Sequence, residues 1–146
     1  STLRRISGAR PNGEAWTMNF PAPHDLILIF ISPQCSACNE TLPHVKDFSR
    51  AASPPVALMS IIDDPGMNRA YIAYQKLEKL NYVSNEKLSD ELNIEAVPYA
   101  LYLSEQGEIL AKGVVNNYEN LAGLKEVSSR RRQEARKKTT VEAARI

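Results

Sequence analysis

The feature that most constrains this chain is a short apolar run followed at once by two cysteines. Leu26–Ile31 (LILIFI) is brief and rich in β-branched residues, which is typical of a strand buried on both faces. A tripeptide containing proline breaks the run, and Cys35 and Cys38 follow at C-x-x-C spacing. Leu42 and Val45 continue from Cys38 at helical spacing. The stretch therefore predicts a buried strand, a short loop carrying the cysteines, and a helix.

This arrangement favours reactive sulfur chemistry at Cys35. The first turn of a helix has unpaired N–H groups and the positive end of the helix dipole, and both favour a thiolate. The thiolate is the species that attacks a disulfide. Cys38, one turn further along the helix, is placed to close a small ring with Cys35 and release a bound partner. The pattern predicts thiol–disulfide exchange.

Two other interpretations of the cysteine pair are disfavoured. A zinc site needs two further ligands, and the only histidines, His24 and His44, do not complete a common zinc pattern with it. We expect both to be surface histidines. A purely structural disulfide is disfavoured because so small a loop constrains the unfolded chain little. We therefore expect a redox pair without a metal or other cofactor.

The rest of the chain alternates strands and helices. Residues 56–62 are expected to form a second buried strand, and Asp64 followed by Pro65 predicts a helix start. That helix is expected to reach about Leu80 with Tyr74 on its inner face, and Tyr71 and Tyr74 are interpreted as packing on a helix face rather than as a ligand surface. Further elements are expected as a brief strand at 82–83, a short helix over 85–92, a hairpin of 99–104 with 108–112, and a last helix. Such an order indicates an α/β fold with parallel strands and crossover helices.

The two ends of the chain differ from this middle. Residues 1–25 are expected to form an N-terminal extension with one edge strand over 14–20, and residues 26–128 to form the domain. Residues 129–146 are expected to be a basic tail, since RRRQEARKK holds six cations and one acid without an apolar stripe. The tail is interpreted as solvated. The alternative is docking on an anionic membrane surface or an acidic partner protein.

The net charge and the apolar runs of the sequence limit the classes of partner that are expected. The 146 residues carry a net charge of +1, which implies no nucleic acid or other polyelectrolyte partner. No apolar run is long enough to cross a membrane. Because the chain begins at Ser1 rather than at methionine, we expect residues upstream of it to have been removed.

A second stretch makes the chain resemble the thioredoxin superfamily. Pro43 stands where that superfamily carries a proline in the active-site helix, and the Val97–Pro98 pair stands where it has a cis-proline. The resemblance implies a thioredoxin-like fold with a central mixed sheet flanked by helices. It implies Cys35 and Cys38 as the catalytic residues. The expected substrate-binding residues are Val97, Pro98, Gln34, Ser36 and Ala37.

Two positions depart from the superfamily pattern. Ile29 occupies the place where many thioredoxins bury an aspartate that helps deprotonate the second cysteine. Gln34 replaces the tryptophan of thioredoxins proper, and the residues between the cysteines carry no charge. These differences argue against a general cytoplasmic thioredoxin. They also leave the proton acceptor for Cys38 unassigned.

Within the superfamily the chain looks most like the methylamine utilisation proteins of the MauD family. The segments SPQCSAC and KGVVNNYENL carry this likeness, which covers roughly residues 15–125. It implies an enzyme that acts on protein thiols or disulfides during maturation of a periplasmic methylamine dehydrogenase. It also implies an extracytoplasmic location, an anchor upstream of Ser1 and a membrane-bound redox partner. A TlpA- or ResA-type reductase of cytochrome c biogenesis and a redox-inactive binding module remain the alternatives.

Overall fold

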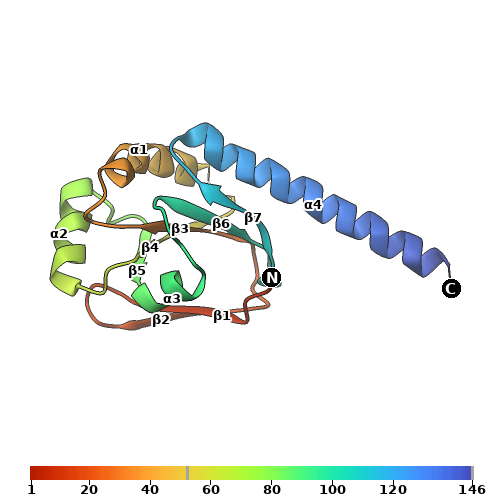
Figure 1. Ribbon diagram of the computed structural model, residues 1–146, viewed down its shortest axis with the longest axis horizontal. Coiled ribbons are helices and arrows are strands. Elements are labelled where there is room, and N and C mark those ends of the chain that lie inside the picture. The colour runs from red at the N-terminus through yellow and green to blue at the C-terminus, as the bar shows by residue number, and fades with distance from the viewer. Residues whose placement is uncertain (52, 146) are drawn as a thin grey trace.

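Seven strands form one mixed sheet in the computed structural model, which describes residues 1–51 and 53–145 (Figure 1). The strands are β1 (Arg5–Ala9), β2 (Ala15–Asn19), β3 (Leu26–Ile31), β4 (Val56–Ser60), β5 (Asn81–Ser84), β6 (Tyr99–Leu103) and β7 (Ile109–Val114). The helices are α1 (Ser36–Arg50), α2 (Pro65–Gln75), α3 (Glu86–Glu91) and α4 (Tyr118–Ala144). The order across the sheet is β2-β1-β5-β4-β3-β6-β7.

Strand β3 lies inside the sheet, as its unbroken apolar sequence predicts. It pairs in parallel with β4 on one side and antiparallel with β6 on the other. None of its side chains is more than 4% exposed. The predicted parallel neighbours and the predicted antiparallel pairing of β6 with β7 are both confirmed.

The alternation of side chains along β3 supplies both hydrophobic cores. Ile27, Ile29 and Ile31 point to the face covered by α1, α2 and α4. Leu28 and Phe30 point to the opposite face, against α3 and side chains of the β1–β2 hairpin. In Figure 1, α1 and the start of α4 lie above β3, and α3 lies below β3, between it and the β1–β2 hairpin. The end of β3 is thus held from both faces, which fixes the start of the loop that follows.

Helix α2 differs from the sequence prediction in its length and its face. Its start is as predicted, because Asp64 accepts a hydrogen bond from the Met67 N–H and Pro65 is the first helical residue. The helix ends at Gln75 rather than near Leu80, and Lys76 takes a left-handed conformation with φ 57°. Tyr74, predicted to face inward, is 83% exposed. The buried face is formed instead by Asn68 and Tyr71.

Strand β1 had no clear signal in the sequence. Only Ile6 of this strand is buried, so no apolar alternation marks it. It forms because it pairs along its whole length with β2, the strand found where the edge strand was expected, and at Ala9 with β5. Gly8 permits this close approach, since a Cβ there would lie 2.8 Å from the Ser84 carbonyl oxygen.

Helix α4 passes through the boundary at which the basic tail was expected to begin and continues to Ala144. Its middle is bound to the domain. Arg132 Nη2 donates to Asp25 Oδ1 at 2.7 Å, and Arg131 Nη1 donates to the Leu110 carbonyl oxygen at 2.6 Å. Beyond that point Ala135, Arg136, Thr139 and Thr140 line an open groove with the turn at 104–108, and the end of the helix projects away from the sheet (Figure 1). Among the described helices, none combines the length and the apolar character that crossing a bilayer requires.

Candidate active site

Cys35 is placed by the turn that joins β3 to α1. The Ser32 side chain accepts the Gln34 N–H at 3.1 Å, and the Ser32 carbonyl oxygen accepts the Cys35 N–H at 3.1 Å. Cys35 is then the N-cap of α1, one position before its first helical residue. Its Sγ accepts the Cys38 N–H at 3.2 Å, the bond that a serine or aspartate oxygen makes at other helix starts. The sulfur therefore lies where helix N–H groups stabilise negative charge.

Cys38 lies directly beneath Cys35 and is fully buried, whereas Cys35 is half-buried. Both cysteines are reduced in the structure. Burial, and after it the hydrogen bond with Cys35, raise the pKa of the Cys38 thiol to about 12. The two sulfurs thus have different surroundings. Cys35 is reachable from solvent, and Cys38 is a protected thiol behind it.

The segment that leads into β6 lies against Cys35. Cys35 Sγ donates to the Val97 carbonyl oxygen at 3.6 Å, a contact between residues 62 positions apart in the chain. Pro98 is buried, and the Val97–Pro98 peptide bond is cis, as predicted. The remaining residues expected to bind substrate, which are Gln34, Ser36 and Ala37, are all exposed beside Cys35. The structure therefore gathers the sequence-predicted site residues around Cys35, with Cys38 and Pro98 buried and Gln34, Ser36 and Ala37 exposed.

No buried carboxylate accompanies Cys38 among the described residues. Ile29 is fully buried in the same apolar cluster as Cys38. Two buried phenols, those of Tyr71 and Tyr82, lie near Cys38. Burial, and after it the nearby Cys38 sulfur, raise the pKa of Tyr71. Burial is also the main reason that the pKa of Tyr82 is raised to about 12. The Tyr71 hydroxyl donates to Asn39 Oδ1 at 2.6 Å, which joins α2 to the residue after Cys38.

Sequence reasoning assigned Tyr71 to packing on a helix face and did not predict its bond with Asn39. The only signal available was a tyrosine at helical spacing, which packing explains equally well. The two histidines are not part of the cysteine site's hydrogen bonding in the described residues. His24 precedes β3 and bonds the Asp25 carbonyl oxygen, at the opposite end of the strand from Cys35.

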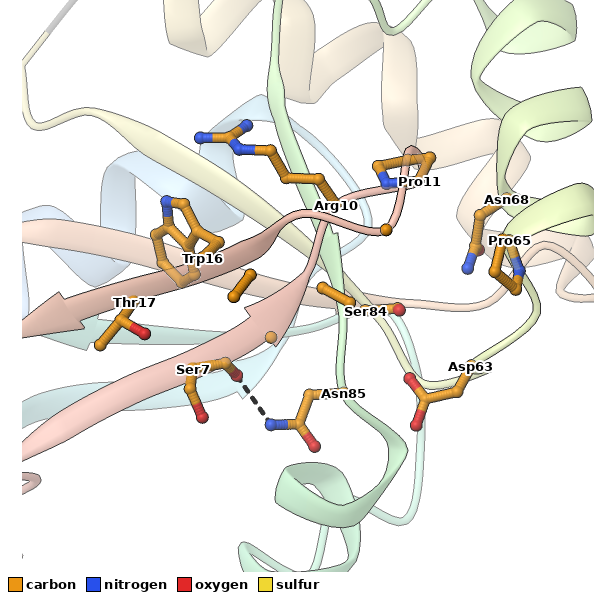
Figure 2. Close-up of a pocket in the computed structure, with 14 residues that line it drawn as sticks. Ser7, Arg10, Pro11, Trp16, Thr17, Asp63, Pro65, Asn68, Ser84 and Asn85 are labelled. Carbon is orange, nitrogen blue, oxygen red and sulfur yellow. Dashed lines mark hydrogen bonds between the residues drawn. The ribbon is translucent and has the colours of Figure 1, made fainter.

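A separate pocket lies between the β1–β2 hairpin, β5 and the start of α2 (Figure 2). Asn85 spans one side of it, since its Nδ2 donates to the Ser7 carbonyl oxygen at 2.7 Å while its Oδ1 caps α3. Neither cysteine lines this pocket, nor does Val97. In the described residues no group of three or more His, Cys, Asp or Glu side chains is assembled to hold a metal ion.

Comparison with curated proteins finds similarity to MauD. The chain is 29% identical over 100 residues to the methylamine utilization protein MauD of Methylorubrum extorquens, covering 68% of this chain and 48% of that protein. It is 29% identical over 122 residues to MauD of Paracoccus denitrificans, covering 84% of this chain and 56% of that protein. The chain thus spans about half the length of the curated relatives it matches. No family model matches it.

Comparison with solved structures identifies the fold. A thiol-disulfide oxidoreductase from Bacteroides fragilis superposes with a TM-score of 0.72 at 18% identity, covering 87% of this chain and 99% of that chain. StoA from Bacillus subtilis superposes with a TM-score of 0.66 at 23% identity, covering 86% and 99%. The chain therefore has a thioredoxin-like fold, and the predicted fold class and resemblance are confirmed.

Proposed function

We propose that this chain, a thioredoxin-fold domain similar to MauD, is a thiol–disulfide oxidoreductase that uses Cys35 and Cys38 as its redox pair. The observation that carries the proposal is the difference between the two sulfurs. One is half-buried at a helix N-cap, and the other is fully buried one turn behind it. A nucleophile that meets the partner and a protected thiol that resolves the intermediate need this arrangement.

The proposed reaction proceeds by two exchanges. The Cys35 thiolate attacks one sulfur of a partner disulfide, so a Cys35–partner disulfide forms and the partner's other sulfur leaves as a thiolate that takes up a proton. Cys38 then loses its proton and attacks Cys35 Sγ, which forms the Cys35–Cys38 disulfide and releases the second partner thiol. The partner gains two electrons and the protein loses two. The reverse sequence forms a disulfide in a partner dithiol.

The second exchange requires that the Cys38 thiol lose its proton, so its rate depends on a proton acceptor. A thiol with a pKa of about 12 is almost entirely protonated at neutral pH, and no buried carboxylate is present among the described residues to accept its proton. The leaving partner thiolate is the base that the first step itself provides beside Cys35. We propose that this thiolate takes up the Cys38 proton, directly or through water.

The substrate class follows from the surroundings of Cys35. The sulfur faces an open surface formed by Gln34, Ser36 and Ala37, with the Val97 carbonyl oxygen beside it. Such a surface suits a cysteine-containing segment of another protein better than a small molecule held in a cavity. We propose protein thiols or disulfides as substrates, with Val97 and Pro98 forming one wall of the binding surface.

The likeness to MauD supports a finer proposal. An extracytoplasmic location, a membrane-bound redox partner and maturation of a periplasmic dehydrogenase are the roles that this likeness suggests, with reduction in cytochrome c biogenesis as the second candidate. Equilibration of the dithiol in glutathione buffers separates the two directions. A strongly reducing pair favours the reductase role, and an oxidising pair favours disulfide formation.

The test of the proposed function is a trapped intermediate. Cys38→Ser is mixed with an oxidised peptide that contains one intramolecular disulfide, and adducts are counted by mass spectrometry without reductant. We expect nearly every Cys38→Ser molecule to carry the peptide through Cys35, because the resolving attack has been removed. The wild-type protein should release reduced peptide instead.

The matched control is Cys35→Ser, which keeps one cysteine and the same size. It should form at least about tenfold less adduct, because its remaining thiol is buried and protonated. Equal adduct formation by the two variants would contradict the assigned roles. A wild-type protein that reduces no peptide, with no adduct on Cys38→Ser, would favour the redox-inactive module.

A further inference from the structure

No ion pair or side-chain hydrogen bond joins the second half of α4 to the rest of the described chain, although Ala135, Arg136, Thr139 and Thr140 line an open groove with the turn at 104–108. Residues 133–144 are exposed at every position. They form no ion pair, and their recorded side-chain hydrogen bonds stay within the helix, from Thr139 to the Ala135 carbonyl oxygen and from Thr140 to the Arg136 carbonyl oxygen. In Figure 1 this half extends well past the sheet. A helix of this length is marginal in water without a packed face, so an external surface would stabilise it.

The charges of the protein are divided between this helix and the body. Residues 130–146 contain seven Lys or Arg and two Glu, whereas residues 1–129 contain eleven Lys or Arg and fifteen Asp or Glu. The net charge of +1 therefore conceals an acidic body and a basic helix. Such a division orients a molecule in an external field, since one part is attracted to an anionic surface and the other is repelled.

Two of the basic residues bind groups within the protein, and the other five form no recorded ion pair or side-chain hydrogen bond. Arg131 and Arg132 face the body and bind the Leu110 carbonyl oxygen and Asp25. Arg130 and Lys137 are seven positions apart, which is two helical turns, so they share the side of α4 that faces away from these contacts. Arg136 and Lys138 are the other basic residues of 133–144, and Arg145 follows the helix. The same segment carries Glu134 and Glu142, and Arg136 lines the groove that also contains Glu105 and Glu108.

The projection lacks the anchors by which a helix docks in a protein groove. Such helices carry apolar residues at i, i+3, i+4 and i+7, and the centres of protein interfaces are apolar. Val141, 52% exposed, is the only large apolar residue between 133 and 144. Without an apolar face the helix cannot insert among lipid chains either. The basic side chains of the helix suit an anionic surface that binds cations without shape complementarity.

We propose that the projecting half of α4 adsorbs the protein electrostatically to an anionic phospholipid surface and leaves the cysteine pair facing away from it. A cluster of several Lys and Arg on a helix is the feature that anionic lipid headgroups attract. The projection leaves the body beside Asp25, which precedes β3, whereas Cys35 follows the other end of that strand. β3 is about 20 Å long, so adsorption and thiol chemistry occur at opposite ends of the domain. This inference goes beyond the proposed oxidoreductase function and does not depend on it.

The test compares two variants of equal charge. Arg136→Gln, Lys137→Gln and Lys138→Gln together remove three cations from the projection. Lys76→Gln, Lys79→Gln and Lys87→Gln remove three from exposed positions of the body. Binding is measured by sedimentation with vesicles of phosphatidylglycerol and phosphatidylcholine at low ionic strength, and with phosphatidylcholine alone. Circular dichroism verifies that each variant keeps its helix content.

We expect the wild-type protein to bind only the anionic vesicles and to dissociate at high salt, where the screening length falls to about 3 Å. Each cation near such a surface changes binding about fivefold, so the helix variant should bind about a hundredfold more weakly. The body variant should bind as well as the wild type or better. The alkylation rate of Cys35 should be the same within about twofold for free and vesicle-bound protein, because the vesicle lies at the other end.

Three outcomes would overturn the proposal. The first is that the wild-type protein does not bind anionic vesicles at low salt. The second is that the two variants lose the same vesicle affinity. The third is that vesicle binding strongly protects Cys35 from alkylation. If the wild-type protein does not bind anionic vesicles, an acidic protein is the remaining candidate partner of the helix. None of them bears on thiol exchange with the peptide disulfide, which is measured without lipid.

Discussion

The contact between Asp25 and Arg132 holds α4 against the domain, and its contribution to stability can be measured directly. Asp25 accepts hydrogen bonds from Arg132 Nη2 at 2.7 Å, from the Tyr102 hydroxyl at 2.7 Å and from the Glu105 N–H at 3.1 Å. Its side chain is 12% exposed, and that of Arg132 is 30% exposed. The pair is therefore shielded from solvent more than an ordinary surface ion pair. We predict that Arg132→Gln destabilises the protein measurably.

The expected magnitude follows from what the variant leaves behind. Hydrogen bonds to a charged group contribute about 1.5–3 kcal/mol, and an isolated surface ion pair contributes at most about 1 kcal/mol. Because Asp25 keeps its bonds from Tyr102 and Glu105, its carboxylate is not left wholly unpaired. We expect a loss of about 2 kcal/mol in the free energy of unfolding at pH 7, or a Tm lower by about 6 °C for a domain of this size.

The effect should depend on pH in a defined direction. Burial by itself would raise the pKa of the Asp25 carboxyl, but the hydrogen bonds from Arg132 and Tyr102 lower it below its usual value of 3.8. The folded state thus binds its proton less readily than the unfolded state. The stabilisation is fully present above the unfolded pKa and is lost as the pH falls through the folded pKa. The difference between wild type and Arg132→Gln should stay constant from pH 7 to about pH 5 and shrink below pH 4.

The assay is urea unfolding followed by far-UV circular dichroism at several pH values. Arg130→Gln is the matched control, because it removes an exposed arginine of the same helix for which the structure records no partner. Its effect should lie within about 0.5 kcal/mol. If Arg132→Gln is no more destabilising than Arg130→Gln, the Asp25 contact does not hold α4 in solution. A difference that persists undiminished at low pH would likewise refute the electrostatic argument.

Three further predictions follow from other contacts. Brief iodoacetamide treatment of the reduced protein near pH 7 should modify Cys35 alone, because Cys38 is buried and its pKa is raised to about 12; peptide mapping by mass spectrometry reads this out. Tyr71→Phe removes the bond to Asn39 and should lower the free energy of unfolding by about 1 kcal/mol in urea. Gly107→Ala should cost about 2 kcal/mol or more by the same measurement, because φ there is 82° and the new Cβ would meet a backbone oxygen.

Each of the last two has a matched control. Tyr74→Phe removes an exposed hydroxyl from the same helix as Tyr71 and should change stability by less than about 0.5 kcal/mol. Gly113→Ala adds a methyl group in β7 where no atom lies within 4 Å. If these controls are as destabilising as the test variants, the specific contacts are not the cause. Modification of Cys38 at the rate of Cys35 would contradict the assigned burial.

The parts of this protein that depend on neighbouring residues could be predicted from the amino-acid sequence. The unbroken run Leu26–Ile31 predicted a strand inside the sheet, and the cysteine spacing after it predicted the start of a helix. Asp64 with Pro65 predicted a helix start for the same reason, since a cap is a bond within one turn of the chain. The location of the candidate site was therefore available before any tertiary structure.

Tertiary structure decided whatever depends on residues distant in the chain. Asp25 and Arg132 are 107 positions apart, so the fixed half of α4 could not be told from a solvated basic tail. β1 has a single buried side chain and becomes a strand only because β2 and β5 supply its partners. Tyr71 and Tyr74 both fitted an inner helix face, and only the position of α1 determined which one is buried. Local bonds leave a pattern in the sequence, whereas a long-range contact between two polar residues has no period and appears only once the chain has folded.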